Sequence, residues 1–301
     1  MAPKIERILE NFALSEGPHW DEDTQSLYFV DIVNQIINKY VPATKKLTTA
    51  ATGAHVSFII PVKGQNNTFI ISREREVRVI TWDGETDNFS VVRKFETTAN
   101  SSVNDGKCDS TGRLWTGTLG LNEENVLAEE LGHIYSIEKD KITKVADNIA
   151  IPNGLAFNKE LKKFYYIDSH KKTIDAYDWD IEQGTIKNCQ PIFTLETHDI
   201  PGIADGMTID TDGNLWVAIY NGSRVIQIDP RKPETLLCTV PLPAQQPTSI
   251  AFGGENLDEL YVTTALLEYG TTEKLLPPVN GAVYRITGLG FKGYPGESFV
   301  L

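Results

Sequence analysis

Short stretches in which apolar and polar residues alternate recur along the whole chain, and polar turns separate them. Residues 26–30, 163–168 and 215–219 are clear cases, and turn clusters such as 64–67 and 211–214 lie between such stretches. A period of two predicts β-strands that turn one face towards a core. Residues 122–130 alone have a helical composition, and we expect a loop or short helix there, over one face of the molecule.

The strands and turns form a longer repeat. Six similar segments begin near residues 16, 56, 105, 153, 205 and 248, each with a polar residue, an apolar stretch, a turn and an aromatic-rich strand. Repeats of 40–52 residues without a helical period are typical of β-propeller blades. The sequence therefore predicts an all-β, six-bladed β-propeller in which residues 1–301 form one domain. We expect a strand near residues 4–9 to close the ring against the last blade, near residues 282–301.

Acidic and amide side chains occupy the first position of four repeats, and glycine follows each of them. The four first residues are Glu16, Asp105, Asn153 and Asp205, and Asn104 directly precedes Asp105. The innermost strands of a propeller begin at the same end of its channel, so these side chains should converge there. Crowded carboxylates need a positive charge between them, and a hard divalent cation with oxygen ligands supplies it. The alternative is that Asp-Gly and Asn-Gly only mark hairpin turns, which we expect at Asp212–Gly213 and Asp83–Gly84.

Charge and composition narrow the class of partner. The net charge of −13 argues against nucleic acid or an anionic membrane surface. The three cysteines have no metal-ligand spacing, and the first residues lack the apolar core of a signal peptide. We expect a monomeric, cytosolic protein that acts on a small molecule.

Five motifs, taken together and in order, resemble one known family. They are Ser-Glu-Gly-Pro-His-Trp (15–20), Asn-Asp-Gly-Lys (104–107), Pro-Asn-Gly-Leu-Ala (152–156), Asp-Gly-Met-Thr-Ile-Asp (205–210) and Gly-Leu-Gly-Phe-Lys-Gly (288–293). The combination resembles the regucalcin, senescence-marker-protein and gluconolactonase family over essentially the whole chain. Residues 56–61, 81–84 and 252–263 look most similar to its luciferin-regenerating branch in insects.

The resemblance implies a six-bladed propeller with one divalent cation in the channel, bound by Glu16, Asn153 and Asp205. Ca²⁺ is the expected ion, with Mg²⁺, Mn²⁺ and Zn²⁺ as alternatives. Asn104 falls on a family position that faces metal and substrate, and Asp105 on one beside it.

Two positions depart from the sugar-lactone-hydrolysing members. Ser102 stands where those members have a substrate-binding arginine, and Asn122 falls near the position of a sugar-binding glutamate. The family's metal ligands are therefore present, whereas its sugar-recognition residues are not. Gluconolactone is consequently a doubtful natural substrate.

The resemblance, together with this ligand set, implies a metal-dependent hydrolase of lactones or esters. Asp205 is the candidate general base, because one carboxylate oxygen can bind the metal while the other faces water. Asn104 would orient the substrate or stabilise an oxyanion. The alternatives are a non-enzymatic Ca²⁺-binding protein and, with no supporting feature beyond the fold, a protein-binding scaffold. Insertions at residues 122–130 and 267–279 favour a roofed pocket and hence the enzyme.

Overall fold

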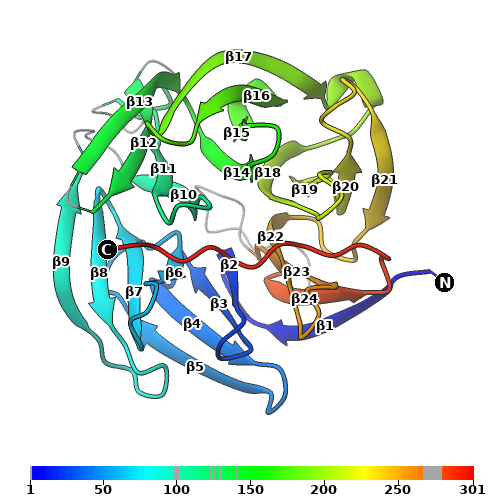
Figure 1. Cartoon of the computed structure of the whole chain (residues 1–301). Coiled ribbons are helices and arrows are strands. Elements are labelled where there is room, and N and C mark those ends of the chain that lie inside the picture. The colour runs from blue at the N-terminus through cyan, green and yellow to red at the C-terminus, as the bar shows by residue number, and fades with distance from the viewer. Residues whose placement is uncertain are drawn as a thin grey trace.

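The computed structural model describes residues 2–97, 102–122, 124, 126–128, 131–139, 141–266 and 280–301. Their strands form six four-stranded antiparallel sheets arranged around a central axis (Figure 1). The expected six-bladed β-propeller is therefore confirmed. Five of the blades are consecutive stretches of chain, as the repeat predicted.

The blades have these strands. Blade 1 comprises β2 (Ser15–Asp21), β3 (Ser26–Asp31), β4 (Ile36–Val41) and β5 (Lys46–Ala51), and blade 2 comprises β6 (Ile59–Pro61), β7 (Thr68–Arg73), β8 (Glu76–Thr81) and β9 (Ser90–Glu96). Blade 3 comprises β10 (Val103–Cys108), β11 (Leu114–Thr118), β12 (Gly132–Glu138) and β13 (Lys141–Ile149), and blade 4 comprises β14 (Pro152–Asn158), β15 (Lys163–Asp168), β16 (Thr173–Asp180) and β17 (Thr185–Thr194). Blade 5 comprises β18 (Ile203–Ile209), β19 (Leu215–Tyr220), β20 (Arg224–Ile228) and β21 (Leu236–Pro241). Blade 6 comprises β22 (Pro247–Gly253), β23 (Glu259–Thr264), β24 (Ala282–Thr287) and β1 (Lys4–Glu10). The described residues also form two 3₁₀ turns, η2 (Ser169–Lys171) and η3 (Glu196–His198).

The first strand of each blade lies nearest the axis, and the last lies at the rim (Figure 1). Inner strands of neighbouring blades contact one another around the channel, for example β10 with β14 and β14 with β18. This arrangement brings the repeat-initial residues to one mouth of the channel, which we call the polar mouth. The opposite end is the far mouth.

The ring closes by pairing the two ends of the chain. β1 pairs antiparallel with β24, from Lys4 opposite Thr287 to Glu10 opposite Ala282, as expected. The closing strand ends at Thr287, however, and does not continue to residue 301. Residues 288–301 instead form a segment, here called the C-terminal strap, that crosses the far mouth (Figure 1).

The C-terminal strap is tied to several blades by backbone hydrogen bonds. Thr211 N–H donates to Lys292 O at 2.8 Å, Phe299 N–H to Pro61 O at 2.9 Å, and Val300 N–H to Gly112 O at 2.9 Å. The strap therefore joins blades 5, 2 and 3 across the channel. Glycine-rich residues 288–293, with positive φ at Gly288 and Gly290, let it turn away from β24.

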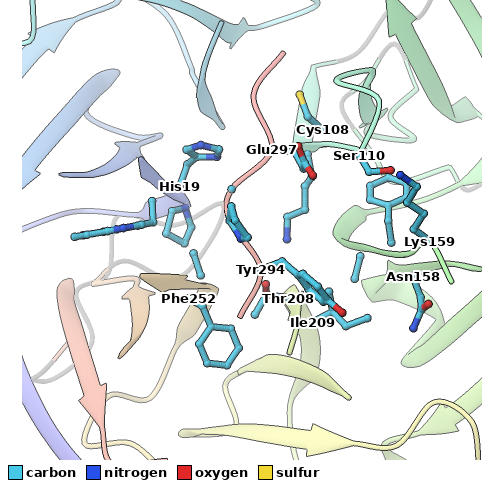
Figure 2. A pocket seen from close by; sticks show the side chains of 18 of the residues that line it. His19, Cys108, Ser110, Asn158, Lys159, Thr208, Ile209, Phe252, Tyr294 and Glu297 are labelled. Atoms are coloured by element: carbon cyan, nitrogen blue, oxygen red, sulfur yellow. The ribbon is translucent and has the colours of Figure 1, made fainter. Parts of the chain in front are cut away.

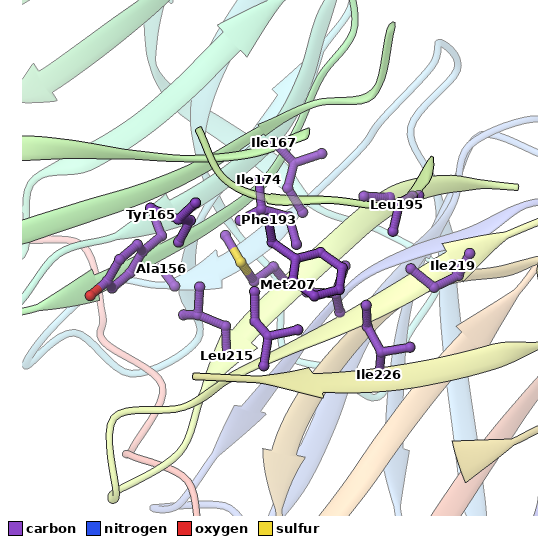
Figure 3. Close-up of a cluster of buried hydrophobic side chains, with 14 of the residues drawn as sticks. Ala156, Tyr165, Ile167, Ile174, Phe193, Leu195, Met207, Leu215, Ile219 and Ile226 are labelled. Carbon is purple, nitrogen blue, oxygen red and sulfur yellow. The ribbon is translucent and has the colours of Figure 1, made fainter. Parts of the chain in front are cut away.

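The core lies between adjacent blades. The cluster in Figure 3 joins Ile174 and Phe193 of blade 4 with Met207, Leu215 and Ile226 of blade 5, all at most 1% exposed. These residues are the apolar positions of alternating strands, so the pattern that predicts the strands also supplies the blade interfaces. Burial on this scale makes the inner strands a rigid frame for the side chains of the polar mouth.

The two expected insertions are described only in part. Residues 267–279 lie outside the described residues. Within 122–130, none of the described residues 122, 124 and 126–128 is helical, and an isolated bridge pairs Leu121 with Leu127. No helix in the described part of the chain is long and apolar enough to cross a membrane.

Candidate metal centre

Glu16, Asn104, Asp105, Asn153 and Asp205, here called the polar ring, come from four inner strands. Each is the second or third residue of its strand, in β2, β10, β14 and β18. Asp205 and Asn153 are 7% and 9% exposed. The structure brings together the five residues that the repeat singled out.

Glycines next to the ring allow the inner strands to approach closely. A Cβ atom on Gly154 would lie 2.7 Å from the carbonyl oxygen of Asp205 and 2.6 Å from Cβ of Met207. A Cβ on Gly206 would lie 2.0 Å from Oγ of Ser249. Any larger residue would push blades apart, so these glycines are required by close approach rather than by a turn. The hairpin alternative does hold for Gly84 and Gly213, whose φ values are +67° and +82°.

Two buried aspartates hold the chain just before the ring residues. The Asp168 carboxylate accepts hydrogen bonds from the N–H groups of Ala150 and Ile151, both at 3.0 Å. Asp31 likewise accepts from Ala13 N–H at 2.9 Å and Leu14 N–H at 3.2 Å. These bonds orient the starts of β14 and β2, and so position Asn153 and Glu16. Sequence analysis missed both aspartates.

The carboxamide of Asn153 has a defined orientation. Ser169 Oγ–H donates to Ala204 O at 2.6 Å, so the Ser169 oxygen must accept the 2.7 Å hydrogen bond from Asn153 Nδ2. Asn153 Oδ1 therefore faces the ring, where it accepts from Asn104 Nδ2 at 2.9 Å. Asn104 Nδ2 also donates to Pro152 O at 2.7 Å. Both amide hydrogens of Asn104 are thus used, whereas no group in the described part of the chain donates to its side-chain oxygen.

The three carboxylates of the ring repel one another. Burial, followed by the nearby charges of Asp205 and Asp105, raises the pKa of Glu16 well above its usual value. Burial and the charge of Asp105 raise the pKa of Asp205 in the same direction. Burial also raises the pKa of Asp105, although Lys107 and the Gly106 N–H group counteract it. The ring is a site of uncompensated negative charge.

These residues fit a divalent cation with oxygen ligands. Two carboxylates and one inward-facing amide oxygen match the donors that Ca²⁺ prefers, and a cation would relieve the repulsion that raises the pKa values. No three Asp, Glu, His or Cys side chains among the described residues are grouped as a metal site by themselves. A cation here consequently needs an amide ligand, which Asn153 can supply.

The residues predicted to bind substrate occupy different environments. Ser102 is half-buried directly before β10, and its carbonyl oxygen accepts from Leu119 N–H at 3.0 Å. Asn122 is exposed, and its Oδ1 accepts from the N–H groups of Glu124 and Val126, both at 2.9 Å. Asn122 therefore orders its own loop, and a role in binding substrate stays a prediction for both residues.

Lys107 is a further charged group of the channel to which sequence analysis gave no role. Its Nζ donates to Met207 O at 2.6 Å and so reaches from β10 to β18. Burial lowers the pKa of the Lys107 ammonium to about 8, against the opposing effect of Asp105. Lys107 follows Asp105 by two positions, and strand alternation could have placed both side chains on the channel side.

Fold and ring define a class of protein: six-bladed propellers with a cluster of carboxyl and amide groups in the channel. The family model described as the SMP-30/Gluconolactonase/LRE-like region matches residues 14–266, and the chain belongs to this family. It is 37% identical over 299 residues to regucalcin of Bos taurus, covering 97% of each chain, and 32% identical over 298 residues to regucalcin of Danio rerio, covering 98% of each. The solved structure of a luciferin-regenerating enzyme is 44% identical, with a TM-score of 0.92 over 100% of both chains. The family resemblance inferred from the five motifs is confirmed.

Proposed function

We propose that this protein is a divalent-cation-dependent hydrolase of lactones or esters. The observation that carries the proposal is the polar ring, where the carboxyl groups of Glu16 and Asp205 repel each other and the amide oxygen of Asn153 is oriented towards Asn104. The family, which includes proteins named gluconolactonases, supports a hydrolase in general terms.

Glu16, Asn153 and Asp205 would hold the cation, which we expect to be Ca²⁺. When bound, it would polarise the carbonyl group of the substrate and lower the pKa of a bound water molecule. Asp205 would accept a proton from the attacking water, since a carboxylate has a second oxygen that the cation does not need. The free oxygen of Asn104 would accept a hydrogen bond from water or from a substrate hydroxyl. Because both amide hydrogens of Asn104 are already donated, orientation is a better role for it than stabilisation of an oxyanion.

Ser102 bears on the substrate class. A serine lacks the charge and the several donors with which an arginine can bind hydroxyl-rich substrates. We therefore expect weak activity on gluconolactone and a preference for flatter or more apolar lactones or esters. Such a preference is compatible with the 44% identity to a luciferin-regenerating enzyme, whose name refers to luciferin and not to a sugar lactone.

A second candidate is a Ca²⁺-binding protein without hydrolytic activity. The same ring could bind Ca²⁺ in such a protein, and the full-length similarity to regucalcins is consistent with this second function. The two functions differ in turnover, not in cation binding.

The experiment measures cation binding and turnover together. Chelated protein is titrated with Ca²⁺, Mg²⁺, Mn²⁺ and Zn²⁺ by calorimetry and assayed on a panel of sugar lactones, aromatic lactones and aryl esters. We expect Asp205→Ala to abolish both binding and turnover. The matched control is Asp178→Ala, since Asp178 forms an ion pair with Lys163 on the surface of blade 4 and should not affect either.

Each outcome separates the candidates. Cation binding without hydrolysis of any substrate would favour the Ca²⁺-binding protein. Full activity after exhaustive chelation, or in Asp205→Ala, would refute the proposed hydrolase.

A further inference from the structure

The far mouth of the channel contains a pocket of about 390 Å³. The later residues of the inner strands β2, β10, β14, β18 and β22 line it, and the C-terminal strap crosses it at residues 294–297 (Figure 2). None of Glu16, Asn104, Asp105, Asn153 or Asp205 lines it. This pocket is separate from the polar ring, and its volume is within the range of about 300–1,000 Å³ typical of small-molecule sites.

Apolar and aromatic side chains form much of the wall. Phe157 comes from β14 and Ile209 from β18. Tyr294 of the strap also lines the pocket and is 50% exposed (Figure 2). The strap leaves little room on the opposite side, where a Cβ atom on Gly296 would lie 2.7 Å from Cε1 of His19. A lining with aromatic and aliphatic side chains is suited to an apolar or aromatic group of a ligand.

Polar groups in this pocket have unused hydrogen-bonding capacity. Lys107 lines the pocket, and within the described part of the chain its ammonium donates one side-chain hydrogen bond, to Met207 O, out of the three it can make. The pKa of about 8 keeps Lys107 charged at neutral pH. Ser110 Oγ is buried there without a partner among the described residues. A half-buried ammonium with two unused donors favours an acceptor in the pocket.

We propose that the far mouth is a second ligand site, which binds a small organic anion with an aromatic body. The anionic group accepts hydrogen bonds from the Lys107 ammonium, and the aromatic body packs against Phe157 and Tyr294. The site does not depend on the proposed hydrolase, because its residues are distinct from the ring.

The charged residues at the rim of the pocket do not cancel the attraction between Lys107 and an anionic ligand. Lys159, Glu160 and Glu297 also line the pocket, but all three are exposed. Solvent and salt screen exposed charges, whereas a charge in the interior of the channel is screened much less. The competing explanation is that Lys107 only closes the channel and balances Asp105, in which case the pocket holds water alone.

The test is calorimetric titration of the full-length, Ca²⁺-loaded protein with 4-phenylbutyrate and its neutral counterpart 4-phenylbutan-1-ol. We expect the carboxylate to bind and the alcohol to bind at least roughly tenfold more weakly, because it lacks the charge. Lys107→Met should weaken carboxylate binding by roughly ten- to a hundredfold, because the loss of a hydrogen bond between charged groups lowers affinity by about that factor. Lys159→Met is the matched control at the exposed rim and should leave the affinity nearly unchanged.

A second variant protects the test against misfolding of Lys107→Met. Tyr294→Ala removes one half-exposed aromatic wall from the strap and should weaken binding severalfold while the protein stays folded. Equal binding of acid and alcohol, or no carboxylate binding up to roughly 10 mM, would overturn the proposal. Binding that Asp205→Ala abolishes and Lys107→Met leaves intact would also overturn it, by placing the carboxylate on the cation of the ring.

Discussion

Ser169→Ala tests whether second-layer hydrogen bonds prepare the cation ligands. Ser169 is 1% exposed, and its hydroxyl connects the side chain of Asn153 to the carbonyl of Ala204, the residue before Asp205. The substitution removes only that oxygen and its hydrogen. It therefore alters the surroundings of two proposed ligands without changing either.

The magnitude follows from the groups left without partners. Asn153 Nδ2 and Ala204 O would both lose a hydrogen bond in a buried site, which costs about 1–3 kcal/mol for each group in the free energy of unfolding. The Asn153 amide would keep only the bond to Asn104 that holds its oxygen towards the ring. We expect Ca²⁺ affinity to fall by roughly five- to thirtyfold, equivalent to about 1–2 kcal/mol.

The assay is Ca²⁺ titration by calorimetry together with urea unfolding of the chelated protein. Ser136→Ala is the matched control, because Ser136 is also buried but donates to Gly184 O, at 3.3 Å, outside the ring. It should lower stability slightly and leave Ca²⁺ affinity unchanged. Ca²⁺ affinity of Ser169→Ala within twofold of the native protein would show that Ser169 does not orient a ligand, and the role assigned to Asn153 would lose its main support.

Three further predictions concern pH, specificity and the strap. Burial, and then the charge of Lys107, lowers the pKa of His19 from 6.5 to about 4. The unfolded chain therefore binds a proton at His19 more readily, and the free energy of unfolding should fall as the pH drops from 6.5 towards 4. The expected loss is about 2 kcal/mol at pH 5. His19→Gln should remove this acid loss in urea unfolding at pH 5 and 7, and an unchanged profile would show that His19 is not its source. Ser102→Arg should raise kcat/KM for gluconolactone roughly tenfold or more relative to an aromatic lactone, and no relative gain would count against Ser102 as the specificity position. Phe299→Ala should lower the free energy of unfolding by about 3–5 kcal/mol, because this fully buried ring fastens the strap, whereas a loss below about 1 kcal/mol would mean that the strap is not part of the core.

The sequence predicted the blades well because each blade repeats one local pattern. The strand expected at residues 163–168 is β15, and that expected at 215–219 is β19 with one residue fewer. The ring could also be predicted, since equivalent positions of equivalent strands must meet at the axis. Both inferences need only periodicity and closure, which are present in the sequence.

The features that the sequence did not predict depend on contacts between blades. Residues 168–170, Asp-Ser-His, resemble an ordinary turn, yet Asp168 supports the start of β14 and Ser169 reaches the carbonyl of Ala204 in the next blade. The strap could not be predicted either, because its glycine-rich start resembles a turn between strands and its partners are far away in sequence. Such partners follow from the three-dimensional packing of blades and not from any local pattern.

Charge balance connects the ring to its proposed chemistry. If Glu16, Asp105 and Asp205 are all ionised they carry three negative charges, and charged Lys107 beside Asp105 supplies one positive charge, so the fully ionised group would have a net charge of −2. A divalent cation brings the buried group to neutrality, which neither a monovalent nor a trivalent ion does. The three proposed ligands would also fall short of the six to eight oxygens that Ca²⁺ takes, so water and substrate would have coordination positions to fill. A storage protein gains from filling those positions with its own side chains. A site that leaves those positions to water and substrate would be better suited to a hydrolase.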